Sequence, residues 1–332
     1  MNRRPSIASV TVAYNGAAVL QNHLNSLRAQ ARALDEIIVV DNASTDETRT
    51  LLSNRFPEVT LLQLPENLGV AGGLAAGLSY AAREKKYDWV WTFDQDSVPA
   101  PDCLENLLLG LDSLSDDEKT AILAPVCLNQ ETSMWYPGLS WRGPRFVPTA
   151  VDPARPVTFV DMVISSGSLI RSEAIAAVGL PDRDLFIDFV DYEYCLRFQQ
   201  SGYRIGVVRD SRLEHAIGTP ATFNFLGRAR SWADHAPWRE YYMARNEVFT
   251  IWKYRPATAT KMFVLYRLAQ HALGILLFGK NKLECFRMMR RGLRDGFAGR
   301  LGIRVLPGSG QLAEQQTAPV SPTQGRFRED AL

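Results

Sequence analysis

The stretch of sequence that decides the fold is residues 36–52, EIIVVDNASTDETRTLL. Its first part, EIIVVD, is a continuous apolar run that ends in an acid, which is typical of a strand buried in a parallel sheet. In the second part, STDETRTLL at 44–52, Ser44 and Glu47 are three residues apart, the spacing of a capping box at a helix N-terminus. We therefore predict a buried strand that is followed closely by a helix.

The same alternation extends outward through the first hundred residues. Strands are predicted at 6–14, 36–41, 59–64 and 89–94, and helices at 18–30, 44–52 and 69–86. This order predicts an α/β fold in which helices cover both faces of a mostly parallel sheet. Ligands of such sheets bind at the carboxyl ends of the strands. The pattern places four polar side chains there, namely Asn15, Asp41, Asn67 and Asp94.

The pattern changes after residue 101. It predicts a helix at 101–114, a strand at 120–126, a strand pair over 159–171, a helix starting near Asp191 and a strand at 203–208. From Trp238 to about residue 298 the pattern is helical. The polar, Pro/Gly/Ser-rich residues 307–330 have the composition of a disordered segment.

The bulk composition is that of a folded globular protein. Of 332 residues, 46% are hydrophobic and 22% are charged. A net charge of +1 gives no electrostatic reason to expect a nucleic acid as partner. The cysteines form no C-x-x-C pair, which argues against a zinc knuckle and suits a reducing cytosol. We recognise no signal peptide in the N-terminal residues, because they lead straight into the first strand.

The C-terminal third is locally basic. Between Lys280 and Arg304 there are eight Lys and Arg residues against the two acids Glu284 and Asp295. An apolar run at 262–279, MFVLYRLAQHALGILLFG, precedes them and predicts a buried or interfacial helix rather than a transmembrane one.

An acid pair follows the strand at 89–94. In WTFDQDS, at 91–97, Asp94 and Asp96 are two residues apart, so in an extended chain their side chains point to the same side. Hard divalent cations prefer carboxylate oxygens, and Mg²⁺ commonly combines one or two carboxylates with substrate phosphates. The structural alternative is a turn in which Asp96 or Ser97 caps the next helix.

Three further stretches have a functional and a structural interpretation each. Asp41 is placed either to accept hydrogen bonds from a nucleotide or to cap a helix. The glycines of ENLGVAGGLAAG, at 66–77, let a sugar nucleotide approach Gly69 and Gly72 or let a helix pack closely on the sheet. His215 is either a ligand or a hydrogen-bonded structural residue.

The segment FIDFVDYEYCLR, at 186–197, places acids among aromatic side chains. Partial desolvation raises the pKa of an acid and suits it to act as a general base. The structural alternative is an acidic helix N-terminus, which the helix dipole favours. The acids are Asp188, Asp191 and Glu193.

Together these stretches resemble glycosyltransferase family 2, the inverting GT-A glycosyltransferases, and most of all the bacterial rhamnosyltransferases of O-antigen and surface polysaccharide assembly. The resemblance covers about residues 6–255, and eight motifs in order match by chance far less often than one. The matching stretches are VTVAYN, VVDNAS, ENLGVAGGLAAG, WTFDQDS, ISSGSLIR, DFVDYEYCLR, LEHAIG and YYMARN. The resemblance implies a GT-A fold, that is, a Rossmann-like mixed sheet with a helical C-terminal extension.

The resemblance also implies roles for individual residues. The donor nucleotide would contact Tyr14, Asn15, Asp41, Asn67, Gly69, Gly72 and Asp94, with Asp41 at the base and Asp94 near the ribose. Mg²⁺ or Mn²⁺ would be held by Asp96 and His215, and Asp191 would be the catalytic base. The acceptor would contact Ser166, Gly167, Asp188 and Glu193. Many relatives have an acid directly before the base, where this chain has Val190, so Asp188 or Glu193 could share that role.

The implied donor is dTDP-rhamnose, and the implied acceptor is a saccharide, most simply a lipid-linked one. We expect residues 1–100 to bind the nucleotide sugar, 101–230 to bind the acceptor and carry the catalytic base, 231–304 to form basic C-terminal helices, and 305–332 to be disordered. On a helix at 281–298, an apolar stripe flanked by arginines suits either an anionic membrane surface or packing on the domain. The stripe is formed by Leu283, Phe286, Met289, Leu293 and Phe297.

Three alternatives remain open at the level of sequence. The first is the same enzyme class with UDP-galactofuranose or a UDP-hexosamine as donor, because donor choice depends on pocket contacts. The second is a nucleotide-sugar-binding protein without a working base. The third is a dinucleotide-dependent oxidoreductase, against which Ala71 counts because it breaks the G-x-G-x-x-G fingerprint.

Overall fold

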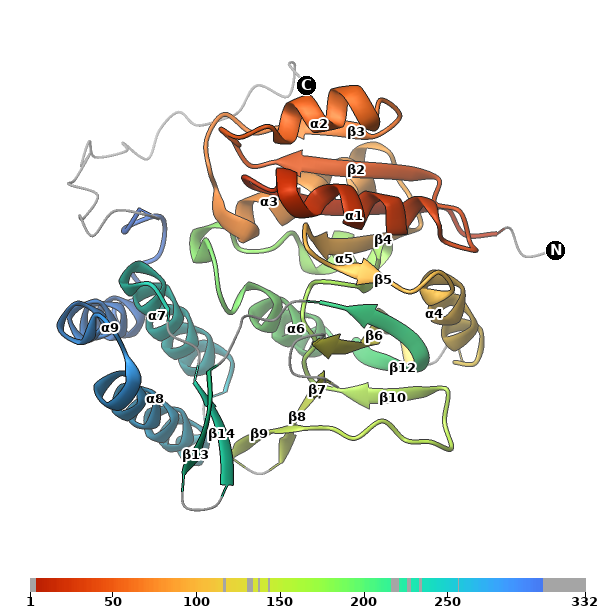
Figure 1. The fold of residues 1–332 in the computed structure, drawn as a ribbon. Coiled ribbons are helices and arrows are strands. Elements are labelled where there is room, and N and C mark those ends of the chain that lie inside the picture. The colour runs from red at the N-terminus through yellow and green to blue at the C-terminus, as the bar shows by residue number, and fades with distance from the viewer. Residues whose placement is uncertain are drawn as a thin grey trace, which may run out of the picture.

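The computed structural model describes residues 4–115, 118–129, 134–136, 138–142, 144–215, 221–225, 228–232, 235–255 and 257–306. From residue 307 on, the predicted disordered tail lies outside the described residues. Strands and helices alternate in the first part of the chain (Figure 1), in the order β1 (Ile7–Ala13), α1 (Ala17–Arg28), β2 (Glu36–Asp41), α2 (Thr48–Arg55), β3 (Thr60–Gln63), α3 (Gly69–Leu78), β4 (Trp89–Asp94), β5 (Val98–Pro99) and α4 (Cys103–Asp112). Residues 79–84 extend α3 as a π-helical segment.

The second part of the chain adds more strands before three long helices. It contains β6 (Thr120–Asn129), β7 (Met134–Tyr136), β8 (Leu139–Arg142), β9 (Arg145–Pro148), β10 (Val157–Val160), β11 (Ser168–Arg171), α5 (Ser172–Val178), α6 (Val190–Gln200), β12 (Arg204–Glu214), β13 (Ala221–Phe225) and β14 (Arg228–Trp232). The C-terminal helices are α7 (Pro237–Tyr254), α8 (Thr258–Phe278) and α9 (Lys282–Phe297).

The main sheet has the strand order β10-β12-β6-β11-β4-β1-β2-β3. β4, β1, β2 and β3 are parallel, whereas β11 runs antiparallel to both of its neighbours, β4 and β6. The predicted mixed, mostly parallel sheet is therefore confirmed. The carboxyl ends of β1, β2 and β4 lie on one edge, and β2 points toward the side where α7–α9 lie (Figure 1).

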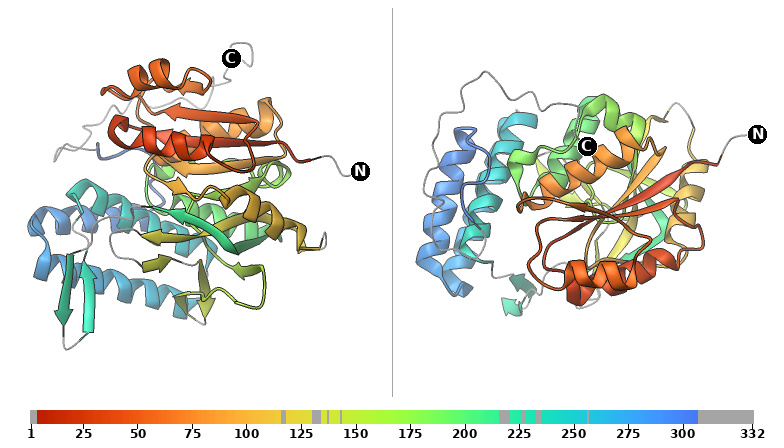
Figure 2. Two further views of the ribbon diagram at one scale, coloured as in Figure 1. Left: turned by 45° about the vertical axis from the view of Figure 1, so that its right-hand side comes forward. Right: turned by 90° about the horizontal axis from the view of Figure 1, so that it is seen from above.

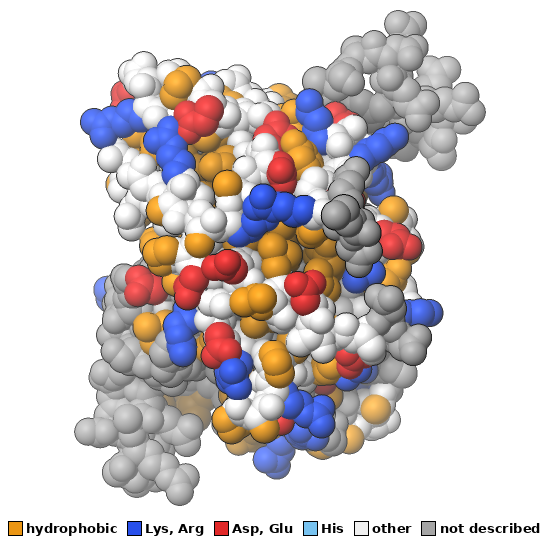
Figure 3. Space-filling model, turned by 90° about the vertical axis from the view of Figure 1, so that its right-hand side faces the viewer, with side chains coloured by type: hydrophobic (Ala, Val, Ile, Leu, Met, Phe, Trp, Pro, Cys, Tyr) orange, Lys and Arg blue, Asp and Glu red, His pale blue; other side chains and the backbone are white. Residues whose placement is uncertain are grey.

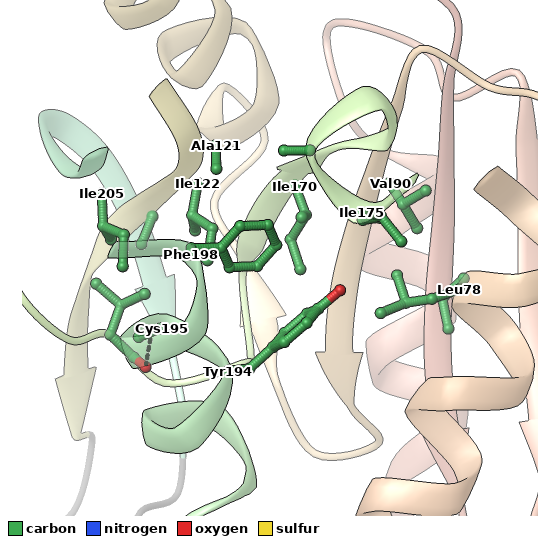
Figure 4. Close-up of a cluster of buried hydrophobic side chains, with 14 of the residues drawn as sticks. Leu78, Val90, Ala121, Ile122, Ile170, Ile175, Tyr194, Cys195, Phe198 and Ile205 are labelled. Carbon is green, nitrogen blue, oxygen red and sulfur yellow. Dashed lines mark hydrogen bonds between the residues drawn. The ribbon is translucent and has the colours of Figure 1, made fainter. Parts of the chain in front are cut away.

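Alternating side chains of the strands build a separate core on each face of the sheet. Ile38 and Val40 of β2 belong to one core, and Val39 between them belongs to the other. Because successive strand residues point to opposite faces, an unbroken apolar run fills both cores at once. Helices α1, α2 and α4 cover one face, and α3, α5 and α6 cover the other (Figure 2). Figure 4 shows the core beneath α3, α5 and α6, where Phe198 of α6 packs between Ile122 and Ile170.

Two local predictions are wrong. Helix α2 begins at Thr48, without a side-chain cap from Ser44, because the Ser44 Oγ instead accepts from the Asn15 N–H and Asp46 accepts from the Thr48 N–H. The segments at 159–171 do not form a strand pair, since β10 pairs with β12 while β11 inserts between β4 and β6. Strand partners distant in the chain decide this arrangement, and a local pattern carries no information about them.

The C-terminal region is helical as predicted, and the apolar stripe on α9 faces mainly inward. Met289 is buried, and Phe286 and Leu293 pack against a core shared with α7 and α8, whereas Leu283 and Phe297 are exposed. The structure thus agrees with the alternative in which α9 packs on the domain. The apolar face that remains exposed belongs to α8.

Candidate active site

A cavity of about 680 Å³ opens at the carboxyl edge of the sheet. It is lined by the ends of β1 and β4, the loop after β2, the start of α3, the loop before α6, the residue after β12 and the start of α7. It is lined by eight of the residues singled out in the sequence, namely Tyr14, Asn67, Gly69, Asp94, Asp96, Asp188, Asp191 and His215. The cavity is therefore the place where residues scattered over two hundred positions meet.

The acid pair and His215 face one another on one wall. His215 Nδ1 lies 3.3 Å from Asp96 Oδ1, and His215 Nε2 lies 3.7 Å from Asp94 Oδ2. Burial opposes the charge on each group, but the hydrogen bond and the charge of His215 hold the pKa of Asp96 below its usual range. Although burial lowers it, the pKa of His215 is raised overall by Asp96 and Asp94. Burial raises the pKa of Asp94, and the opposing effect of the His215 charge on this pKa is smaller.

Two serines support this wall from behind. The Ser97 hydroxyl is hydrogen-bonded to His215 Nδ1 at 2.9 Å and to the Ser166 hydroxyl at 2.5 Å. The Asp94 N–H donates to Ser166 Oγ at 3.2 Å. Both serine side chains are buried, so Ser166 lies under Asp94 rather than in the cavity, which speaks against its predicted acceptor contact. Ser165 takes the cavity position instead.

Asp191 lies across the cavity in the first turn of α6. Burial raises the pKa of Asp191 to about 7, and the nearby charges of Asp94 and Asp188 act in the same direction. The Tyr192 N–H donates to Asp191 Oδ1 at 2.9 Å and only partly offsets them. A carboxyl group that titrates near neutral pH at a cavity wall can accept a proton from a hydroxyl group.

The other two acids of this segment have different surroundings. Asp188 lines the cavity and is paired with Arg239 of α7. Glu193 is buried away from the cavity, where it accepts hydrogen bonds from Arg197 and Tyr254. Both carboxylate oxygens of Glu193 are thus occupied, which speaks against its predicted acceptor contact and against a share in the role of base.

The YYMARN segment holds the loop that presents Asp188 and Asp191. Asn246 Nδ2 lies within hydrogen-bond distance of three backbone oxygens, those of Leu185 (2.9 Å), Ile187 (2.7 Å) and Asp188 (2.9 Å). Arg245 donates to the oxygens of Leu185 and two further residues from a buried position. The loop needs such support because Phe186, Asp188 and Phe189 have φ angles of 65°, 61° and 63°.

The donor-side residues divide into those that line the cavity and those that support it. Gly69 lines it, and a Cβ there would lie 2.2 Å from the Phe186 carbonyl oxygen, so glycine is required both by this contact and by its φ of 70°. Asn67 Oδ1 accepts from the Gly69 N–H at 2.9 Å. Gly72 does not line the cavity, and a Cβ there would meet Leu68.

Asp41 and Asn15 do not line the cavity either. Asp41 is fully buried and accepts hydrogen bonds from the Ser44 N–H at 3.0 Å and from Arg49 Nε at 2.6 Å. Asn15 accepts from the Thr45 N–H at 2.8 Å and so joins the two loops that follow β1 and β2. Gly167 lies in the turn before β11, where its N–H donates to the Thr92 carbonyl.

The side chains of this site suit a metal ion that is bound partly by the protein and partly by a phosphate-containing ligand. Among the residues that the structure describes, no group of three or more His, Cys, Asp and Glu side chains is arranged to hold a metal ion by itself. The carboxylates of Asp94 and Asp96 supply oxygen ligands of the kind that Mg²⁺ and Mn²⁺ accept when phosphate oxygens and water complete the shell. The residues present therefore fit a partial site.

Several residues of the cavity wall were not predicted from the sequence. Arg239 is the most important, because it is a cation in a cavity that holds four acids. It precedes the YYMARN motif by two positions and is 51 residues from its partner Asp188, so no local signal links the two. Asn42, Gln95, Ser165 and Tyr192 also line the cavity.

Comparison with known proteins gives a consistent picture. The model of the family "Glycosyl transferase family 2" matches residues 9–150. The chain is 29% identical over 304 residues to the dTDP-rhamnosyl transferase RfbF of Shigella flexneri, covering 90% of this chain and 97% of that one. It is also 29% identical over 254 residues to the galactofuranosyltransferase GlfT1 of Mycobacterium tuberculosis, covering 74% and 82%.

Solved structures agree at the level of the fold. S. aureus TarS superimposes with a TM-score of 0.53 at 16% identity, over 88% of this chain and 49% of that one, so this chain spans about half of TarS. GalNAc-T7, solved with UDP, GalNAc and Mn²⁺, has a TM-score of 0.55 at 14% identity, over 84% and 57%. With this fold and the match of residues 9–150 to the family model, the chain resembles glycosyltransferase family 2, and it is a glycosyltransferase.

Proposed function

We propose that this enzyme transfers L-rhamnose from dTDP-rhamnose to a hydroxyl group of a saccharide acceptor, with inversion at the anomeric carbon. One observation of the structure supports the transfer chemistry above all. The acid pair Asp94 and Asp96 and the carboxyl group of Asp191, with its pKa of about 7, line the same cavity. The choice of rhamnose is supported by the likeness to a dTDP-rhamnosyl transferase, which spans 97% of that relative.

The donor would enter along the carboxyl edge of the sheet. Tyr14, Asn67, Gly69 and Asp94 line this part of the cavity and would contact the nucleotide. Asp41 would contact the base only after Arg49, which is bonded to it, moves aside. Asn15 and Gly72 would act indirectly, by shaping the loops at this edge.

In the proposed transfer step, Asp191 is the general base. Its carboxylate accepts the proton of the acceptor hydroxyl as that oxygen forms a bond to the anomeric carbon. The bond between this carbon and the diphosphate oxygen breaks, and the nucleoside diphosphate leaves with the electron pair. A single displacement inverts the anomeric centre, and a positioned base contributes roughly 10²–10⁴-fold to the rate.

Asp96 and His215 would hold Mg²⁺ or Mn²⁺ beside Asp94. When bound, such an ion stabilises the negative charge that develops on the leaving diphosphate. The depressed pKa of Asp96 keeps its carboxylate ionised and ready to bind a cation. Arg239 lines the same cavity and adds a fixed positive charge that acts on Asp94.

We further propose a role for each of the three regions of the chain. Residues 1–100 bind the nucleotide sugar, 101–230 carry the base and bind the acceptor, and 231–304 support the catalytic loop. Of the predicted acceptor contacts, the proposal retains Asp188, because its side chain lines the same cavity as Asp191. Since a lipid-linked saccharide is the expected acceptor, the enzyme would work in the cytoplasm at the inner face of the cytoplasmic membrane.

Calorimetric titration tests the donor assignment. The titrants are dTDP-rhamnose, dTDP, UDP-galactofuranose and a UDP-hexosamine, each with and without Mg²⁺ or Mn²⁺. We expect metal-dependent binding of dTDP-rhamnose that is lost in Asp96→Ala. Preferential binding of a UDP-sugar would leave the enzyme class intact and refute the rhamnosyl assignment. UDP-galactofuranose is the second candidate, because the likeness to a galactofuranosyltransferase covers 82% of that relative.

A further inference from the structure

One side of helix α8 carries a continuous row of exposed apolar side chains. They recur at spacings of three, four and seven residues, so on a helix of 3.6 residues per turn they lie on one side. Their exposed fractions range from 38% to 59%. We name the α8 outer face after its members: Met262, Leu265, Tyr266, Leu273, Leu276 and Leu277.

The opposite side of α8 is fixed to the rest of the protein. Val264, Leu268 and Ile275 are buried in the core shared with α7 and α9. Two polar contacts with α7 lie at the middle of the helix: Arg267 is 3.2 Å from Glu247, and His271 is hydrogen-bonded to Glu240 at 2.6 Å. The outer face is therefore presented by a helix that is anchored along its length.

The charged residues within α8 and at its two ends are all basic. From residue 258 to residue 283 there is no Asp or Glu, and Lys261, Lys280 and Lys282 stand at the two ends of α8. On α9, Arg287 and Arg290 are exposed, and the single acid Glu284 before them is 3.9 Å from Arg287. The side of the molecule away from α7–α9 is different, because charged side chains of both signs are interspersed there with apolar ones (Figure 3).

We propose that the α8 outer face docks the enzyme on an anionic phospholipid membrane, with α8 lying parallel to its surface. Apolar side chains on one side of a helix enter the boundary between headgroups and acyl chains, and lysines beside them are attracted by anionic headgroups. The proposal rests on the proposed function in one respect. If the acceptor is linked to a lipid, docking on the membrane brings the active site close to it.

Other occupants fit the face less well. In an antiparallel pair of α8 helices from two copies, the lysines at the two ends would lie close to one another, which costs energy. The remaining residues 307–332 contain few large apolar side chains to cover the face. Helix α8 is long and apolar enough to cross a membrane. Crossing would, however, take Arg267 and His271 into the bilayer or away from their partners on α7, at high cost.

Vesicle co-sedimentation tests the proposal. The full chain is mixed with phosphatidylcholine vesicles with and without phosphatidylglycerol, and compared with the double variant Leu273→Glu/Leu276→Glu. Leu109→Glu on α4 is the matched control, because Leu109 is exposed to 61% on another face. We expect the anionic vesicles alone to bind the wild type and the control. The double variant should bind roughly 10–100-fold more weakly, because a loss of this size corresponds to the free energy of burying a leucine side chain.

Several results would overturn docking. The first is equal sedimentation of the double variant and the wild type. The second is resistance of the bound enzyme to extraction by alkaline carbonate, which indicates a spanning helix. The third is a wild-type dimer that the double variant abolishes, which indicates that a second copy covers the face. Titration of the same proteins with dTDP-rhamnose separates the two proposals. Donor binding without vesicle binding refutes docking alone, and vesicle binding without donor binding refutes the proposed function alone.

Discussion

Arg239 of α7 and Asp188 of the loop before α6 form a two-pronged ion pair in the cavity wall. Arg239 Nη2 lies 2.9 Å from Asp188 Oδ1, and Arg239 Nε lies 3.2 Å from Asp188 Oδ2. The pair joins the C-terminal helices to the loop that carries the proposed base. It also places a neutralising cation beside an acid whose charge otherwise raises the pKa of Asp191.

Replacing the proposed base should separate catalysis from binding. Asp191→Asn keeps the size of the side chain but removes its ability to accept a proton. We expect the transfer rate to fall roughly 10²–10⁴-fold while the affinity for the donor, measured by calorimetry, stays near that of the wild type. The exposed Asp112→Asn serves as the control and should leave both unchanged. Transfer at a near wild-type rate by Asp191→Asn would place the base elsewhere.

The pH dependence of transfer should report the titration of Asp191. Protonated Asp191 cannot accept a proton, and its pKa is raised to about 7 in the folded protein. The value of kcat/KM should therefore rise about tenfold per pH unit below pH 7 and level off above it, because kcat/KM reports groups of the free enzyme. A profile that is flat from pH 5 to pH 8 would contradict this assignment.

The ion pair offers a way to move that midpoint in both directions. Asp188→Asn removes a negative charge that raises the pKa of Asp191, so the midpoint of the kcat/KM profile should shift to lower pH. Arg239→Gln leaves Asp188 without its cation, so the midpoint should shift to higher pH. Shifts of the same sign in the two variants would show that the charges act on another group.

The hydrogen bonds of Asn246 should matter for both stability and activity. Asn246→Asp is nearly isosteric, but it replaces a donor to three backbone oxygens by an acceptor that they repel. We expect a loss of about 1–3 kcal/mol in the free energy of unfolding together with a fall in kcat/KM. Thermal unfolding and initial rates measure the two effects.

Asn106→Asp is the control for that experiment. Asn106 also donates to a backbone oxygen, that of Asp210, but at the exposed surface. Its replacement should change stability little, because water satisfies the oxygen that is left. Equal losses in the two variants would mean that the loop before α6 needs no buried donor.

The sequence by itself was enough to predict the sheet edge and its acids. Apolar runs such as EIIVVD and WVWTFD are local patterns, and each ends in the acid that the structure places at the carboxyl edge, Asp41 and Asp94. Parallel strands bring their ends together whatever their order in the sheet. The segments that carry Asp96, Asp191 and His215 were also recognisable, because motif spacing is a property of the chain.

Only the tertiary structure decided how those residues are used. Glu193 and Asp191 are two positions apart in one helix, yet one is buried against Arg197 and Tyr254 and the other faces the cavity. Arg239 reached the site because α7 packs beside the loop before α6. The exposed apolar face lies on α8, whereas the stripe predicted on α9 is mostly packed against other helices. A periodic pattern in the sequence does not distinguish apolar side chains that pack against α7 from apolar side chains that are exposed. Burial and partners distant in the chain set charge, pKa and exposure, and these are not properties of a local sequence.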